Sequence, residues 1–138
     1  MSQWTHVNAS IRFDGFQGLG LPTEKELGKI CKWEDEDTQH WEKSKLPCGS
    51  EGSIEYKIIK NTDESSIAAM VVVFYGDLRD YSNKLAILDY FNTIINGNFI
   101  RSGILEIEIE FDKVFVYKYN QELRKFKLIY EEKDEITT

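Results

Sequence analysis

The chain contains few of the residues that build metal centres and disulfide frameworks. Its 138 residues include only two histidines and two cysteines. Metal sites normally need more imidazole or thiolate ligands at regular spacings, so we expect neither a metal site nor another cofactor. Cys31 and Cys48 lie too far apart for a Cys-x-x-Cys motif, and two thiols without an export signal indicate a reducing cytosol.

The sequence also lacks a long apolar run and an excess of positive charge. The longest apolar run, residues 67–75, is about half of the roughly 20 residues that a membrane span needs. The chain does not open with a basic segment and an apolar run, so we expect neither a signal peptide nor a membrane anchor. A net charge of −7 repels phosphate backbones and argues against direct nucleic-acid binding.

Length and composition are those of one domain. Hydrophobic residues make up 41% of the chain and aromatic residues 13%, which is enough to fill one core. We expect a single domain over residues 1–130 and a frayed polar tail over residues 131–138.

The hydrophobic patterns predict an α+β fold. Alternation or apolar runs indicate strands at residues 5–13, 53–60, 67–75, 104–111, 114–119 and 124–130. Helical spacing indicates helices over residues 24–33 and from Ser82 to Gly97. This order is that of a ferredoxin-like β-α-β-β-α-β sandwich, with an added C-terminal hairpin. The expected inner stripe of the second helix is Leu85, Leu88, Phe91 and Ile95.

In a ferredoxin-like sandwich the helices cover one face of the sheet and leave the other open. On the open face we expect three stripes. The acidic stripe is formed by Glu106, Glu108 and Glu110, the apolar stripe by Met70, Val72 and Phe74, and the polar stripe by His6, Asn8, Ser10 and Arg12 of the first strand. An uncovered apolar stripe usually marks an interface, although the C-terminal hairpin can also cover it. We therefore expect a homodimer or a higher homo-oligomer, formed through this stripe or through an edge strand. The fourth strand is expected to direct Leu105, Ile107, Ile109 and Phe111 inward.

The best local candidate for a ligand site is the loop Cys-Gly-Ser-Glu-Gly-Ser at residues 48–53. Its two glycines allow several backbone N–H groups to point at one anion, and its serines add hydroxyl donors. It lacks the lysine and the spacing of a phosphate loop, and it also fits a simple turn before an edge strand. The expected donors are Cys48, Gly49, Ser50, Gly52 and Ser53, with Arg12, Lys57, Arg79 and Arg101 as charge partners.

Residues 76–81 form a second candidate site, read as a loop before the second helix. Asp77 and Asp80 suit a cation there, and Arg79 suits a phosphate or a carboxylate. The alternative is a helix-entry loop whose acids favour the helix N-terminus through its dipole. His6 is read as a surface residue of the first strand, because no third residue completes a nucleophile pair with Cys48.

The glutamates of the fourth strand have two interpretations. Alternate residues on a strand are about 7 Å apart, so one ion rarely bridges all three side chains. A solvated face is therefore the simpler interpretation, with the basic residues Arg124, Lys125 and Lys127 of the last strand beside it.

Three segments resemble a set of small proteins from bacteriophage genomes. They are Trp-Thr-His-Val at residues 4–7, Leu-Pro-Cys-Gly-Ser-Glu-Gly-Ser at 46–53 and Gly-Asp-Leu-Arg-Asp-Tyr at 76–81. The resemblance covers about residues 4–110 and implies an accessory protein made in the cytoplasm of an infected bacterium. It assigns no catalytic role, and it does not cover the C-terminal hairpin. Accessory phage proteins of this size often block host defence.

Three functional hypotheses follow. The first is a phage-type anti-defence protein that sequesters a small anionic, nucleotide-derived signal, with aromatic side chains available to stack a base. The second is an acidic inhibitor that imitates nucleic acid or docks on the basic surface of a host defence effector. The third, ranked last because no paired histidine motif or metal cluster is present, is a phosphoester-cleaving enzyme. We expect binding without catalysis.

Overall fold

A computed structural model of the chain describes residues 2–16, 24–32, 47–60, 67–96 and 98–133. Its elements, in chain order, are β1 (Trp4–Phe16), α1 (Glu24–Lys32), β2 (Glu55–Lys60), β3 (Ile67–Arg79), α2 (Lys84–Ile95), β4 (Ile100–Ile109), β5 (Val114–Asn120) and β6 (Lys125–Glu131). No helix within the described ranges is long and apolar enough to cross a membrane.

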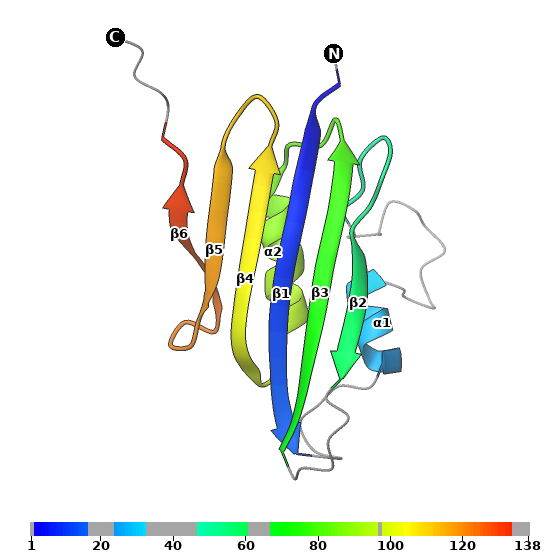
Figure 1. Cartoon of the computed structure of the whole chain (residues 1–138), viewed down its shortest axis with the longest axis vertical. Helices are drawn as coiled ribbons and strands as arrows, with labels where there is room; N and C mark the ends of the chain where they lie inside the picture. The colour runs from blue at the N-terminus through cyan, green and yellow to red at the C-terminus, as the bar shows by residue number, and fades with distance from the viewer. Residues whose placement is uncertain (1, 17–23, 33–46, 61–66, 97, 134–138) are drawn as a thin grey trace.

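The strands form one six-stranded sheet in the order β2-β3-β1-β4-β5-β6. Every neighbouring pair is antiparallel. Both helices lie behind this sheet as Figure 1 views it, and no described segment covers the front. The predicted α+β class is confirmed, and β4 flanks β1 as expected. The front of the sheet is called the uncovered face below.

The strand bounds differ from the prediction most in β4 and β3. β4 begins at Ile100 rather than at residue 104 and ends at Ile109 rather than at residue 111, and β3 ends at Arg79 rather than at residue 75. The register of β3 with β1 runs without interruption from Phe16↔Ile67 to Trp4↔Arg79. Because β1 pairs along its whole length, β3 continues through most of the segment that was expected to be a loop at residues 76–81. At the opposite edge of the sheet, the C-terminal hairpin extends past its expected limit. Glu131 belongs to β6, and the Glu132 N–H donates to the Val114 carbonyl at 2.9 Å.

Helix α2 begins and packs differently from the prediction. Its N-cap is Asn83 rather than Ser82, because the Asn83 side chain accepts a hydrogen bond from the Ala86 N–H. Leu85 is 69% exposed and is not part of the inner stripe. The buried residues of the helix are Ile87, Tyr90, Phe91, Ile94 and Ile95. Gly97, the expected helix end, lies outside the described residues.

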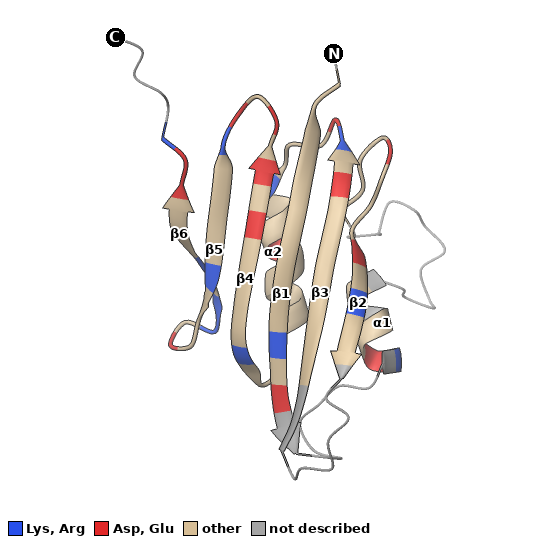
Figure 2. Cartoon of the chain, viewed as in Figure 1, with Lys and Arg blue, Asp and Glu red and all other residues tan. Residues whose placement is uncertain are grey.

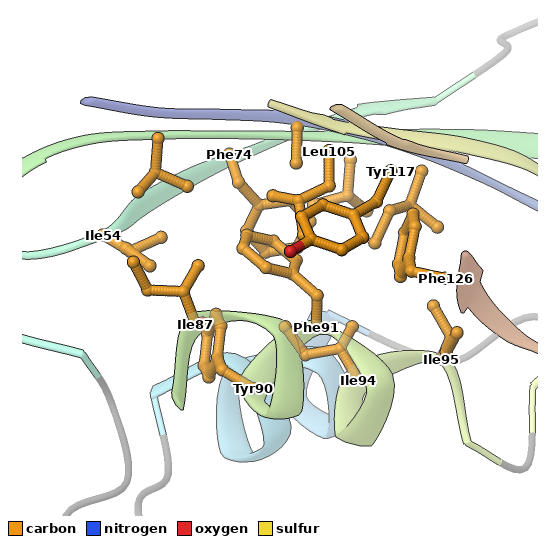
Figure 3. Close-up of a cluster of buried hydrophobic side chains, with 14 of the residues drawn as sticks. Ile54, Phe74, Ile87, Tyr90, Phe91, Ile94, Ile95, Leu105, Tyr117 and Phe126 are labelled. Carbon is orange, nitrogen blue, oxygen red and sulfur yellow. The ribbon is translucent and has the colours of Figure 1, made fainter. Parts of the chain in front are cut away.

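The core lies between the sheet and the two helices and is built around aromatic rings (Figure 3). The Phe91 ring meets Phe74 and Tyr90 edge-on, each at a centroid distance of 5.1 Å. The Tyr90 hydroxyl donates to the Cys31 carbonyl and so ties α2 to α1. On β4, Leu105, Ile107 and Ile109 are buried as predicted. The expected inward position of Phe111 is wrong, because β4 ends at Ile109 and Phe111 lies in a turn with a φ of 64° and 76% exposure.

The predicted apolar stripe on the uncovered face is also wrong. Met70, Val72 and Phe74 are at most 1% exposed and belong to the core. The register places Val72 opposite Ile11 and Met70 opposite Phe13, both of which face the helices. A strand with apolar residues on both sides does not reveal which side is inward, and pairing with β1 decides it. The uncovered face of β3 instead carries the alternate residues Val71, Val73 and Tyr75.

Candidate binding sites

The loop at residues 48–53 packs onto the end of β3, and two of its backbone N–H groups, those of Gly49 and Ser50, are already hydrogen-bonded. The Gly49 N–H donates to the Gly52 carbonyl at 2.9 Å, and the Ser50 N–H donates to the Arg79 carbonyl at 2.9 Å. Gly52 has a φ of +80°, and a Cβ atom there would lie 2.0 Å from the Asp77 carbonyl oxygen. These contacts explain both glycines as requirements of loop docking, and an anion would compete with them for the same N–H groups.

The Arg79 side chain is also engaged. Its Nη1 lies 2.5 Å from the Glu51 carboxylate, and its Nε donates to the Ser2 hydroxyl at 3.0 Å. The Arg79 N–H donates to the Glu51 carbonyl at 3.0 Å, which closes the loop onto the strand. Partial burial raises the pKa of the neighbouring Cys48 thiol, so this thiol is protonated at neutral pH. Arg79 therefore holds the loop in place, while its role toward a ligand stays a prediction.

His6, which we predicted to be a surface residue of the first strand, contacts two carboxylates. Its Nδ1 lies 2.5 Å from Asp77 Oδ1, and its Nε2 lies 2.9 Å from Glu110 Oε2. The hydrogen bond to Asp77 first, and then the one to Glu110, raises the pKa of His6. The hydrogen bond from His6 is the main cause that lowers the pKa of Glu110, which also accepts from the Trp4 N–H at 3.1 Å.

This cluster joins β1, β3 and the turn that follows β4 through one imidazole. Both ring nitrogens have carboxylate partners, so the protonated ring is stabilised and neither nitrogen is available as a base. The residues that the structure describes include no group of three or more His, Cys, Asp or Glu side chains arranged to hold a metal ion. The alternating pattern of the sequence predicted that His6 lies on the uncovered face. Its partners come close only when β1 pairs with β3 and with β4, so no local sequence pattern identified them.

A cleft of about 560 Å³ opens near the start of β4, beside the β5–β6 turn. It brings two arginines, Arg101 and Arg124, to the same hollow as the 70% exposed ring of Phe99. The Asp14 carboxylate, also in the lining, lies 3.7 Å from the Arg101 Nε and 3.3 Å from the Arg12 Nε. The other residues that line the cleft are Ile95, Asn96, Asn98, Ile100, Tyr119 and Gln121.

Backbone contacts hold the walls of this cleft in place. The Gln121 side-chain amide donates to the carbonyls of Ile100 and Arg101 at 3.1 and 2.9 Å, which ties the β5–β6 turn to β4. Arg124 has a φ of 53°, and its N–H donates to the Asn120 carbonyl at 2.8 Å. The sequence prediction included Arg101 and missed both Arg124 and Phe99, because the fold of the C-terminal hairpin and the end of α2 bring these residues together.

The charged residues predicted to share one ligand are distributed along the sheet. In the strand register, Arg79 lies opposite Trp4 at one end of β1. Arg12 lies eight residues further along β1 than Trp4, opposite Val71. Eight residues of strand span about 27 Å, too far for one small molecule. Lys57 is exposed on β2, opposite Val73. Of the predicted partners, Arg12 and Arg101 come together through their shared contact with Asp14.

Two of the three glutamates of the predicted acidic stripe, Glu106 and Glu108, lie on the uncovered face of β4, whereas Glu110 lies in the turn after β4 and contacts His6. Glu108 is exposed, and Glu106 is half-buried beside it. Figure 2 shows acidic positions on β3 and β4 toward the end of the sheet where the N-terminus lies. Basic positions on β1, β4 and β5 lie toward the other end.

The chain matches no protein-family model, no curated protein and no solved structure.

Proposed function

We propose that the chain is a binding protein that holds a small anionic, nucleotide-derived molecule in the cleft of Arg101 and Arg124. The observation that carries this proposal is the convergence of two guanidinium groups and one exposed aromatic ring on a single hollow of about 560 Å³. A volume of this size is within the range of ordinary ligand pockets.

The chemistry of the lining favours a phosphorylated ligand with a flat ring. Guanidinium groups form paired hydrogen bonds with phosphate oxygens, and each such bond is charge-assisted. Phe99 offers an exposed ring face on which a base can stack. Asp14 already neutralises part of the Arg101 charge, so Arg124 is the stronger of the two candidates for a phosphate.

Isothermal titration calorimetry with cyclic di-AMP, cyclic di-GMP and ADP-ribose tests the proposal. We expect saturable heat from at least one of these probes, with the probe recovered unchanged afterwards. The variant Arg101→Ala/Arg124→Ala is expected to weaken binding by at least about tenfold, because it removes the charge-assisted hydrogen bonds.

Two other variants locate the site. Lys25→Ala, an exposed change on α1, is the matched control and is expected to leave the affinity unchanged. Loss of binding in Lys57→Ala but not in the double arginine variant would move the site to β2 and contradict the proposal. Absence of heat with all three probes would also contradict it, and a chemically altered probe would indicate catalysis.

A second candidate function is favoured by the acidic end of the uncovered face. Glu106, Glu108 and Asp77 lie near one another there, at strand positions that pair across β4, β1 and β3. Such a surface suits docking on a basic effector protein. The expected result is salt-sensitive capture of one host protein that Glu106→Lys/Glu108→Lys loses and Lys25→Glu retains.

The setting that we propose for either function is the cytoplasm of a bacterium infected by a phage, where the protein would act against host defence. The resemblance of residues 4–7, 46–53 and 76–81 to bacteriophage accessory proteins supports this setting. We further propose that β1 to β4 and the two helices form a ferredoxin-like unit to which β5 and β6 are added. The element order β1-α1-β2-β3-α2-β4 and the strand order β2-β3-β1-β4 support this assignment.

A further inference from the structure

The strand register arranges the centre of the uncovered face in four rows that run across the strands. The Trp4–Arg79 position lies beyond them at one end and the Asp14–Ala69 position at the other. Arg79 and Asp14 are already ion-paired within the chain, with Glu51 and with Arg12 and Arg101. The first row holds Asp77 and Glu108 on either side of His6. The second row includes Glu55, Tyr75, Asn8, Glu106 and Val116. The third row includes Lys57, Val73, Ser10, Ile104 and Lys118. The fourth row includes Ile59, Val71, Arg12 and Ser102.

Charge changes sign between the second and the third row. The first two rows carry carboxylates, and Glu110 adds another beside His6. The third and fourth rows carry Lys57, Lys118 and Arg12, and Lys127 of β6 extends the third row beyond Lys118. Figure 2 shows this division along β2 and β4, whereas on β1 it shows one basic position with an acidic position further from the N-terminus.

The boundary between the two charged halves is apolar. A shallow depression of about 320 Å³ lies there, and Val73, Tyr75 and Ile104 are among the residues that line it. Ile104 is 44% exposed, Tyr75 51% and Ile59 52%, so the centre of this face exposes large apolar side chains. Exposed apolar surface surrounded by polar residues is typical of a protein interface.

We propose that a second copy of this chain docks on the uncovered face. The two copies are related by a two-fold axis that lies between the sheets and runs perpendicular to the strands. This operation places the acidic rows of each copy over the basic rows of the other, and it places the two apolar centres in contact. The inference is independent of the proposed ligand.

The charge pattern selects both the occupant and the axis. A partner of a single charge sign would match one half of the face and be repelled by the other half. A two-fold axis parallel to the strands would place acidic rows on acidic rows. A copy rotated about the perpendicular axis satisfies both halves at once, which is the self-complementarity that a closed dimer requires.

The geometry of sheet packing is compatible with this arrangement. Sheets that pack face to face lie about 10 Å apart and cross at about 30°, so rows on the central strands stay opposed while the edges diverge. On those central strands, Glu106 of one copy approaches the third row of the other, near Lys118. Glu108 approaches the fourth row, near Arg12.

Sedimentation equilibrium of the purified full chain tests the proposal. We expect a dimer in the wild type and a monomer in Ile104→Glu, which places a charge in the apolar centre. Leu85→Glu is the matched control, because Leu85 is exposed on α2 at the covered side of the sheet. It is expected to leave the dimer intact.

A charge-reversal mixture tests the axis itself. Arg12→Glu/Lys118→Glu reverses the basic charges that β1 and β5 carry on this face, and Glu106→Lys/Glu108→Lys reverses two of its central carboxylates. Each double variant alone is expected to dimerise at least about tenfold more weakly than the wild type, because like charges then oppose one another. An equimolar mixture is expected to restore the dimer, which also shows that both variants are folded.

Four results would overturn the proposal. They are a monomeric wild type, a dimer that Ile104→Glu leaves intact, a mixture that stays monomeric, and a wild type that forms only one-to-one complexes with another protein. The second result would assign the dimer to an edge strand instead.

Discussion

At the residue scale, His6 links strands that are far apart in the sequence. Its partners Asp77 and Glu110 are 71 and 104 residues away in the sequence. The native state binds the His6 proton more tightly than the unfolded chain does, because both carboxylates favour the imidazolium. Proton binding and folding are therefore linked at this residue.

The sign of this linkage defines a pH window. Because the pKa of His6 is raised above 6.5, its contribution to stability is complete below pH 6.5 and is lost as the pH rises through the native pKa. Because the pKa of Glu110 is lowered below 4.5, its contribution is complete above pH 4.5 and is lost as the pH falls through the native pKa. The stability difference between the wild type and His6→Gln should be largest between these two limits.

Urea unfolding of both proteins from pH 4 to pH 9 measures that difference. The substitution Lys25→Gln, at an exposed site on α1 outside the proposed dimer face, is the control and should follow the wild type at every pH. A difference between the wild type and His6→Gln that stays constant from pH 6 to pH 9 would show that the imidazolium does not stabilise the fold.

At the element scale, β6 depends on one residue. Phe126 is 3% exposed, whereas the other residues of β6 are exposed. Its ring meets Phe91 and Tyr119 edge-on at centroid distances of 6.4 and 6.3 Å. Its N–H donates to the Asn92 side chain at 2.9 Å, which ties the edge strand to α2.

The substitution Phe126→Ala should therefore destabilise the protein by about 3 kcal/mol, because it removes a buried ring and leaves a cavity. It should also speed amide exchange in β6 more than in β1. Ile129→Ala, at a site 56% exposed on the same strand, should change the free energy of unfolding by less than about 0.5 kcal/mol. Equal urea midpoints for the two variants would contradict the anchoring role of Phe126.

The inward face of a strand with one polar face was predictable from the sequence, whereas the inward face of β3 was not. In β1 and β4, alternation distinguishes inner residues such as Ile11 and Leu105 from polar residues that face solvent. In β3, valines occupy both faces, so only the register with β1 identifies Val72 as buried. The cleft shows the same limit. Arg101 was identified from its charge, but Arg124 and Phe99 join it through tertiary contacts that no local pattern encodes.

At the scale of the whole molecule, two electrostatic effects on dimerisation have opposite signs. Each copy has a net charge of −7, so two copies repel one another at long range, and added salt reduces this repulsion. The opposed acidic and basic rows attract one another at short range, and added salt weakens that attraction. The response of the dimer to salt reports which effect dominates.

The short-range attraction between opposed rows should dominate above about 0.1 M salt, because the Debye length there is about 10 Å and the repulsion between distant charges is already screened. Raising sodium chloride from 0.1 to 0.5 M should therefore weaken the wild-type dimer in sedimentation equilibrium. The Arg12→Glu/Lys118→Glu variant should respond in the opposite direction, because repulsion between its faces then outweighs the attraction that Lys57 and Lys127 still provide. If salt strengthens the wild-type dimer instead, the opposed rows do not drive association, and the apolar centre around Ile104 must hold the two copies together without them.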